Sequence, residues 1–133
     1  MTMVGVIVNG ARGKMGQLAA QTISDSPYFE LVAGIGRADD LSETIAATNA
    51  SIVVDLTSAE SVYENTQAII ASGAHPVIGA SGLLPDQIAK LARECKAKAF
   101  GGIIVPNFSI AAVLMMRFAE QAAHYLPDVE IIE

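Results

Sequence analysis

A run of small and β-branched apolar residues near the start of the chain leads directly into a glycine-rich turn. The run Val4-Gly5-Val6-Ile7-Val8 is typical of a buried strand. The turn Gly10-Ala11-Arg12-Gly13-Lys14-Met15-Gly16 follows, and residues 17–21 then favour a helix. Glycines let a chain turn sharply and approach a ligand closely, and the first N–H groups of a helix attract anions. The segment therefore predicts an α/β fold with a backbone site for phosphate, and hence a nucleotide cofactor.

The rest of the chain alternates strand-like and helix-like segments. Strands are expected over Val4–Val8, Phe29–Ile35, Ser51–Leu56, His75–Ile78 and Phe100–Val105. Helices are expected over Met15–Ser24, Asp39–Thr48, Thr57–Gly73, Pro85–Lys98 and Ser109–Tyr125. Asp40 is expected to cap the second helix, with Glu43 three residues later, and Thr57 to cap the third, with Glu60 three residues later. These β-α units with short loops predict a Rossmann-like, doubly wound parallel sheet with helices on both faces.

Composition narrows the class of protein. Apolar residues make up 52% of the 133 residues and charged residues 17%, which suits one compact domain and argues against disorder. The net charge of −6 and the scattered basic residues argue against a nucleic-acid partner, and we expect Lys90, Arg93, Lys96 and Lys98 to form a solvated helix face. No apolar run approaches the ~18–20 residues of a membrane span. A lone cysteine, Cys95, and no signal peptide favour the cytoplasm.

The chemically interesting residues all follow predicted strands. In parallel α/β sheets, ligands bind beyond the carboxyl ends of the strands, where the strand order reverses. The segments that follow the five strands are Gly10–Gly16, Gly36-Arg37, Thr57-Ser58, Gly79-Ala80-Ser81-Gly82 and Pro106-Asn107-Phe108-Ser109. We expect them to converge on one site. Taken singly, the Gly10–Gly16 and Gly79–Gly82 segments are also compatible with plain structural turns.

The residues after the second strand bear on which nucleotide binds. Dinucleotide-binding folds usually place an acid there to hold the ribose hydroxyls. This chain has Gly36-Arg37 at that point, and Asp39 and Asp40 come slightly later. An arginine can pair with a 2′-phosphate through its planar fork, which favours NADP(H). The alternative is that Arg37 is an exposed loop residue, so NADPH and NADH both stay open.

No pattern in the chain indicates a metal site or a catalytic acid. His75 and His124 are far apart and lie on different predicted elements, without a nucleophile or carboxylate at a recognisable spacing. Asp55 ends a buried strand, where we expect it to orient a loop by hydrogen bonds.

Taken together, these motifs resemble the bacterial dihydrodipicolinate (4-hydroxy-tetrahydrodipicolinate) reductase family. The resemblance extends over nearly the whole chain. The motifs that carry it are Gly10–Gly16, Val54-Asp55-Leu56-Thr57, Val77-Ile78-Gly79-Ala80-Ser81-Gly82, Pro106-Asn107-Phe108-Ser109-Ile110 and Asp128-Val129-Glu130-Ile131-Ile132-Glu133. It implies an oxidoreductase of lysine and diaminopimelate biosynthesis, which moves a hydride from NADH or NADPH to a cyclic dicarboxylate. A homotetramer is implied for the full-length protein.

The resemblance also implies roles for particular residues. Gly10, Ala11, Arg12, Gly13, Lys14 and Met15 would hold the pyrophosphate, and Arg37 the adenosine ribose or its phosphate. The nicotinamide end would be lined by Gly79, Ala80, Ser81, Val105, Pro106, Asn107 and Phe108. The Ser81 hydroxyl stands where the family usually has a threonine that also touches substrate.

Part of the family pattern is not found in these residues. In the family, a His-His-x-x-x-Lys-x-Asp-Ala-Pro-Ser-Gly segment supplies the proton donor and a substrate-binding lysine, and it does not occur in this chain. We therefore expect residues 1–127 to be the NAD(P)-binding domain and residues 128–133 to begin a missing substrate and tetramerisation domain. No catalytic residue is expected in this chain, which should be inactive alone. The alternative is a stand-alone nucleotide-binding module without catalysis.

Overall fold

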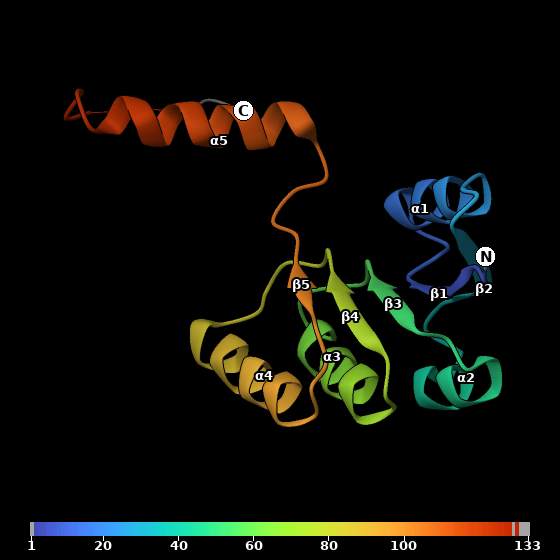
Figure 1. Cartoon of the computed structure of the whole chain (residues 1–133). Helices are drawn as coiled ribbons and strands as arrows, with labels where there is room; N and C mark the ends of the chain where they lie inside the picture. The colour runs from blue at the N-terminus through green and yellow to red at the C-terminus, as the bar shows by residue number, and fades with distance from the viewer. Residues whose placement is uncertain (1, 129, 131–133) are drawn as a thin grey trace.

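The computed structural model describes residues 2–128 and 130, which form a five-stranded sheet and five helices. The strands are β1 (Val4–Asn9), β2 (Phe29–Ile35), β3 (Ile52–Asp55), β4 (His75–Ile78) and β5 (Ile103–Ile104). The helices are α1 (Lys14–Ser24), α2 (Leu41–Thr48), α3 (Val62–Ala71), α4 (Pro85–Ala97) and α5 (Ile110–Ala123). The strand order is β2-β1-β3-β4-β5 and neighbouring strands are parallel (Figure 1). The predicted Rossmann-like sheet is confirmed.

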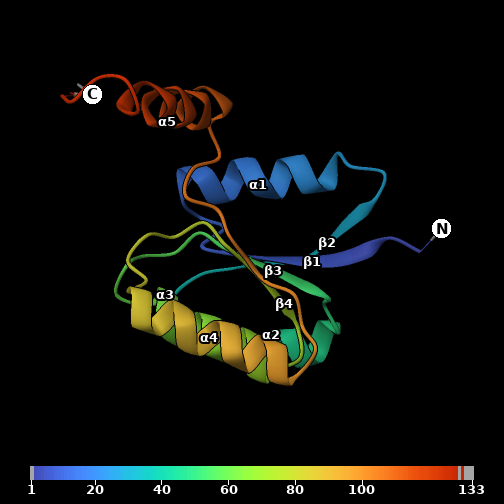
Figure 2. The ribbon, with the colours of Figure 1, turned by 60° about the vertical axis from the view of Figure 1, so that its left-hand side comes forward.

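The helices cover the two faces of the sheet unequally. Helix α1 lies on one face, and α2, α3 and α4 lie on the other (Figure 2). The core fills the space between the sheet and the three-helix layer, where Ile7, Val53 and Ile69 are fully buried. Central strands of a parallel sheet are covered on both faces, which explains why β1 and β3 are apolar apart from their last residues, Asn9 and Asp55.

Two helix starts and one helix face agree with the sequence prediction. The Asp40 side chain accepts the Glu43 N–H at 2.9 Å and caps α2. The Ser109 hydroxyl accepts the Ala112 N–H at 3.3 Å and caps α5. The spacing of Val62, Thr66, Ile69 and Ile70 predicts that they share one side of α3, and all four residues are buried.

The predicted start of α3 is wrong. Thr57 and Glu60 were expected to form a capping box, but the helix begins at Val62 and Ser61 occupies the cap position. The hydroxyl and N–H of Thr57 both donate to Asp55, so Thr57 is held against the end of β3. Residues 58–61 form a turn instead, in which the Val62 N–H donates to the Ser58 carbonyl at 3.0 Å.

The C-terminal part of the fold is shorter and more open than predicted. Strand β5 spans Ile103 and Ile104, not Phe100–Val105, and beyond it the Val105 N–H donates to the Ile78 carbonyl of β4 at 2.8 Å. Helix α5 extends away from the sheet (Figure 1). Within the described residues it contacts no other element, and none of its side chains is buried. The strand expected over residues 128–133 falls mainly on residues 129 and 131–133, which lie outside the described residues.

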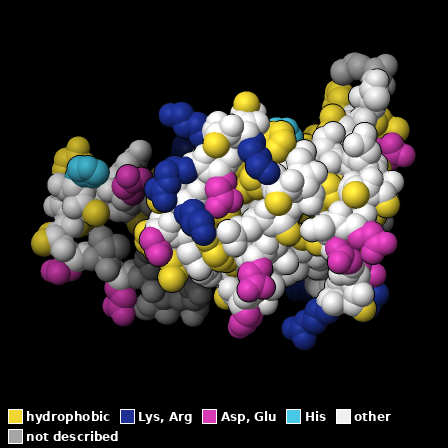
Figure 3. Space-filling model, turned by 90° about the horizontal axis from the view of Figure 1, so that it is seen from below, with side chains coloured by type: hydrophobic (Ala, Val, Ile, Leu, Met, Phe, Trp, Pro, Cys, Tyr) yellow, Lys and Arg dark blue, Asp and Glu magenta, His cyan; other side chains and the backbone are white. Residues whose placement is uncertain are grey.

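Helix α4 places its basic residues on the surface, as predicted. Lys90, Arg93, Lys96 and Lys98 are exposed, and basic side chains gather over this helix (Figure 3). The Lys98 ammonium donates to the Ile70 carbonyl at 3.2 Å near the end of α3. In the part of the chain that the structure describes, no helix is both long and apolar enough to cross a bilayer.

Candidate functional site

A cavity of about 1070 Å³ opens at the carboxyl ends of β1, β2 and β3. Strand order reverses between β1 and β3, which is where ligands bind in this class of sheet. The residues that line the cavity come from three loops and the start of two helices: Asn9, Gly10, Arg12, Gly13, Gly36, Arg37, Asp39, Leu41, Leu56, Thr57, Ser58, Glu60, Ser61 and Asn65. Four of the predicted cofactor residues (Gly10, Arg12, Gly13 and Arg37) are thus brought together.

The glycine turn after β1 is closed by backbone contacts. The N–H groups of Gly10 and Ala11 donate to the Ile35 carbonyl at 2.9 and 3.0 Å. Gly10 has a φ of +88°, and a Cβ there would lie 2.7 Å from the Leu56 carbonyl oxygen. A Cβ on Gly16 would lie 2.0 Å from the Gly10 carbonyl oxygen. Neither position can hold a larger residue without moving the backbone.

Helix α1 begins beside the cavity with unsatisfied donors. Its cap residue, Gly13, has no side chain to accept from the first turn. Among the described residues, nothing accepts a hydrogen bond from the N–H groups of Lys14, Met15 or Gly16. Free N–H groups at a helix N-terminus, together with the helix dipole, form an anion site. The exposed side chains of Arg12 and Lys14 add positive charge beside it.

The loop after β2 folds back on itself through Asp39. The Asp39 Oδ2 atom accepts the Gly36 N–H at 2.8 Å and lies 4.0 Å from Nη2 of Arg12. Sequence reasoning placed Asp39 beyond the strand end and assigned it no role. The signal that could have identified it is the spacing, because an Asp three residues after a glycine can close a tight turn. Arg37 is exposed and lines the cavity beside this turn.

The loop after β3 is ordered by a buried carboxylate. Asp55 is 0% exposed, and its Oδ1 atom accepts both the N–H (2.9 Å) and the hydroxyl of Thr57. The Asn9 amide donates to its Oδ2 atom at 3.4 Å, and the Asn65 amide donates to the Thr57 hydroxyl at 3.0 Å. This network confirms Asp55 as a loop-orienting residue. Sequence reasoning missed Asn9 and Asn65, since each is remote in sequence from its partner.

Glu60 stands at the rim of the cavity with a perturbed carboxyl group. Its pKa is lowered by a hydrogen bond from the Ser58 side chain, by a backbone hydrogen bond and by the charge of Arg37. Glu60 is fully exposed, so this attraction is screened by water. Both Glu60 and Arg37 line the cavity, and the charge of Arg37 contributes to the lowered pKa of Glu60.

The predicted nicotinamide residues form a second, more open group. The N–H groups of Gly79 and Ala80 donate to the Asp55 backbone carbonyl at 2.9 and 3.1 Å. The Phe108 ring lies against Gly79, since a Cβ there would be 2.5 Å from Phe108 Cε2. The Asn107 side chain accepts the Ser109 N–H at 2.8 Å and so acts as a local cap.

These residues do not form the wall of the large cavity. Gly79, Ala80, Ser81, Val105 and Pro106 are absent from its described lining. Asn107 and Phe108 instead border a smaller hollow of about 220 Å³ at the start of α5.

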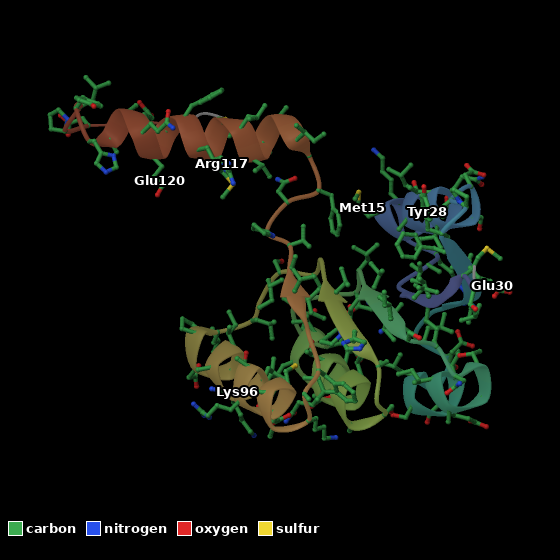
Figure 4. The ribbon with its side chains drawn as sticks, in the orientation of Figure 1. Met15, Tyr28, Glu30, Lys96, Arg117 and Glu120 are labelled. Carbon is green, nitrogen blue, oxygen red and sulfur yellow. The ribbon has the colours of Figure 1, made fainter. Side chains whose placement is uncertain are left out.

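Met15 belongs to the turn after β1 but points elsewhere. It is 44% exposed and projects from α1 on the side facing the segment that leads from β5 into α5 (Figure 4). Ala11, Lys14 and Met15 are therefore adjacent to the cavity rather than part of its described lining.

The two histidines lie away from the cavity. The Gly101 N–H donates to His75 Nδ1 at 3.1 Å, and the ring packs edge-on against Phe100. His124 lies at the end of α5, with Nδ1 2.9 Å from the Glu120 carbonyl. Among residues 2–128 and 130, no three His, Cys, Asp or Glu side chains are grouped so that they could hold a metal ion.

Comparisons with known proteins agree with this architecture. Residues 4–108 match the family model described as "Dihydrodipicolinate reductase, N-terminus". The 4-hydroxy-tetrahydrodipicolinate reductase of Coxiella burnetii (strain RSA 493 / Nine Mile phase I) is 52% identical over 98% of this chain and 54% of the relative. The reductase of Legionella pneumophila (strain Lens) is 56% identical over 96% of this chain and 53% of the relative.

A solved structure shows the same fold. It is the dipicolinate-bound dihydrodipicolinate reductase from Paenisporosarcina sp. TG-14, which matches with a TM-score of 0.85 and 33% identity. The match covers 97% of this chain and 57% of that chain. The chain thus spans about half the length of the curated relatives it matches. On its sequence motifs, its fold and these matches, the chain belongs to the dihydrodipicolinate reductase family and corresponds to its N-terminal domain.

Proposed function

We propose that this chain is the cofactor-binding half of an NAD(P)H-dependent 4-hydroxy-tetrahydrodipicolinate reductase. The observation that carries the proposal is the start of α1, where three N–H groups without acceptors lie beside a cavity at the β1/β3 switch point. Such a helix start binds the pyrophosphate of a dinucleotide. The residues fit this group, because Gly10 and Gly16 keep the turn free of Cβ atoms.

Two groups of site residues hold the two ends of the cofactor. Gly10–Met15 bind the pyrophosphate, and Arg37 contacts the adenosine ribose or its 2′-phosphate. Gly79–Ser81 and Val105–Phe108 line the nicotinamide end, where the Phe108 ring offers a flat apolar face. The nicotinamide supplies a hydride when NADH or NADPH is bound.

The substrate is a cyclic dicarboxylate, with Ser81 as its contact in this chain. The name of the Paenisporosarcina structure, which has dipicolinate bound, supports this substrate class. Reduction also needs a proton donor and groups that hold the carboxylates, which we assign to the half of the relatives that this chain does not cover. In this proposal residues 128–133 begin that second domain, the whole enzyme is a cytoplasmic homotetramer, and the chain alone does not turn over substrate.

A chimeric enzyme tests the proposal directly. Residues 1–133 are fused to the part of the Legionella pneumophila reductase that lies beyond the matched half, and oxidation of NADPH is followed with and without 4-hydroxy-tetrahydrodipicolinate. We expect substrate-dependent oxidation by the chimera and none by the chain alone. Arg37→Ala in the chimera should raise the KM for NADPH more than the KM for NADH.

Two results would contradict the proposal. A folded chimera that binds NADPH but does not reduce the substrate would support the alternative of a nucleotide-binding module without catalysis. Turnover by the 133-residue chain itself would show that the catalytic groups lie within it.

A further inference from the structure

The end of β2 lacks the side chain that usually reads the ribose. Dinucleotide-binding folds place an acid there, which accepts a hydrogen bond from the ribose 2′-hydroxyl. This chain has Gly36, and the Arg12 side chain occupies the adjacent space. A Cβ on Gly36 would lie 3.5 Å from Arg12 Nε and 3.7 Å from Arg12 Cζ. A side chain at position 36 would therefore lie in direct contact with Arg12.

Asp39, in the loop after β2, places a carboxylate at the end of this strand. Its Oδ2 atom accepts the Gly36 N–H at 2.8 Å, which closes the turn and returns the side chain to the strand end. The same oxygen lies 4.0 Å from Nη2 of Arg12. The Asp39 side chain is 39% exposed, so it lines the cavity and remains open to a ligand.

The charges that line this end of the cavity balance. Arg12 and Arg37 contribute two positive charges, and Asp39 and Glu60 contribute two negative charges. A 2′-phosphate would have to compete with Asp39 for Arg12 and would be repelled by both carboxylates. A 2′-hydroxyl carries no charge, and it can donate a hydrogen bond to the free lone pairs of Asp39.

We infer that Asp39 is the specificity-determining carboxylate of the cofactor cavity, which favours NADH and opposes the 2′-phosphate of NADPH. Arg37 acts in the opposite direction, so the preference of the protein is set by the balance between the two side chains. The inference rests on the proposed function, because it requires the adenosine ribose to lie in this cavity.

The variant Asp39→Asn separates the charge of Asp39 from its structural role. The asparagine Oδ1 atom can still accept the Gly36 N–H, so the turn is kept while the negative charge is lost. Asp40→Asn is the matched control, because it removes the same charge one residue further on. Asp40 does not line the cavity, and asparagine is as good a helix cap as aspartate.

Each protein is titrated with NADH and NADPH, and with 5′-AMP and adenosine 2′,5′-bisphosphate, which isolate the adenosine end. For Asp39→Asn we expect the ratio of the NADH Kd to the NADPH Kd to rise about fivefold to tenfold. The same shift is expected between the two adenosine nucleotides. For Asp40→Asn the ratio should change less than about twofold, because the charge is exposed and screened.

The outcomes distinguish the inference from the function it rests on. If Asp39→Asn binds both nucleotides with an unchanged ratio, or weakens both equally, Asp39 is not a selector although the cavity binds a dinucleotide. If the wild-type protein binds none of the four nucleotides, the proposed function itself is wrong and the inference falls with it.

Discussion

A Cβ added at Gly16, in the glycine turn after β1, would meet backbone atoms, whereas a Cβ added at Gly79, in the loop after β4, would meet side chains. A Cβ on Gly16 would lie 2.0 Å from the Gly10 carbonyl oxygen and 2.8 Å from Ala11 Cα. A Cβ on Gly79 would meet the Phe108 ring at 2.5 Å and Leu56 Cδ2 at 2.6 Å. Backbone in a closed turn cannot give way, but a ring that is 48% exposed can rotate. The proposed pyrophosphate end is therefore preformed, and the proposed nicotinamide end can adjust.

The largest effect is expected at Gly16. Gly16→Ala places a methyl group against backbone and should lower the free energy of unfolding by about 3–5 kcal/mol. Gly13→Ala is the matched control, because its Cβ would meet only the Gly10 carbonyl oxygen, at 3.4 Å, and its φ of −74° suits alanine. Urea unfolding of both variants measures the difference. Equal stability of the two would show that the turn is not rigid.

An intermediate effect is expected at Thr57, which is held at the end of β3. Thr57→Val removes the hydroxyl that donates to Asp55 and accepts from Asn65, and leaves part of a buried carboxylate unsatisfied. We expect a loss of about 1–3 kcal/mol in the free energy of unfolding. Thr57→Ser keeps the hydroxyl and should lose less than about 1 kcal/mol. If serine and valine destabilise equally, the methyl group matters and the network does not.

The smallest effect is expected at Gly79. Gly79→Ala should cost about 1 kcal/mol or less, because Phe108 can move into solvent. The double variant Gly79→Ala with Phe108→Ala should recover the part of this cost that comes from the ring, while the contact with Leu56 Cδ2 remains. A loss at Gly79 as large as that at Gly16 would mean that both loops are equally rigid, and the contrast between them would disappear.

Much of the fold follows from local sequence. The apolar runs and the caps at Asp40 and Ser109 predict the strands and helices within one or two residues, except for the starts of α3 and β5. The apolar positions of α3 also predict its buried face. These features depend on residues close together in the chain, where hydrophobic periodicity and hydrogen-bonding side chains act directly.

The errors arise where a side chain has two competing partners. Thr57 has the spacing of a helix cap with Glu60, but its hydroxyl binds Asp55 and α3 starts five residues later. Asp39 looks like part of a helix start, yet its carboxylate turns back to Gly36. Local spacing cannot decide between two acceptors or two donors. Which partner the side chain binds depends on the sheet, which places the ends of β1, β2 and β3 side by side.

The length of β5 also could not be predicted from the sequence. Residues 100–105 have strand-like composition, but only Ile103 and Ile104 pair with β4. The Gly101 backbone is instead held by His75, whose Nδ1 atom accepts the Gly101 N–H. A strand pattern shows that residues suit a sheet, and the tertiary context decides how many of them pair.

Titration of the protein with NADPH, comparing Gly13→Asp with Gly13→Asn, tests the central claim most directly. Both substitutions supply a good cap for α1 at a position with room for a side chain, so both should fold. They differ in a negative charge beside the proposed pyrophosphate. We predict saturable binding by the wild-type and Gly13→Asn proteins, and a Kd at least about 30-fold higher for Gly13→Asp. Equal affinity of the two variants, or no binding by a folded wild-type protein, would contradict the account.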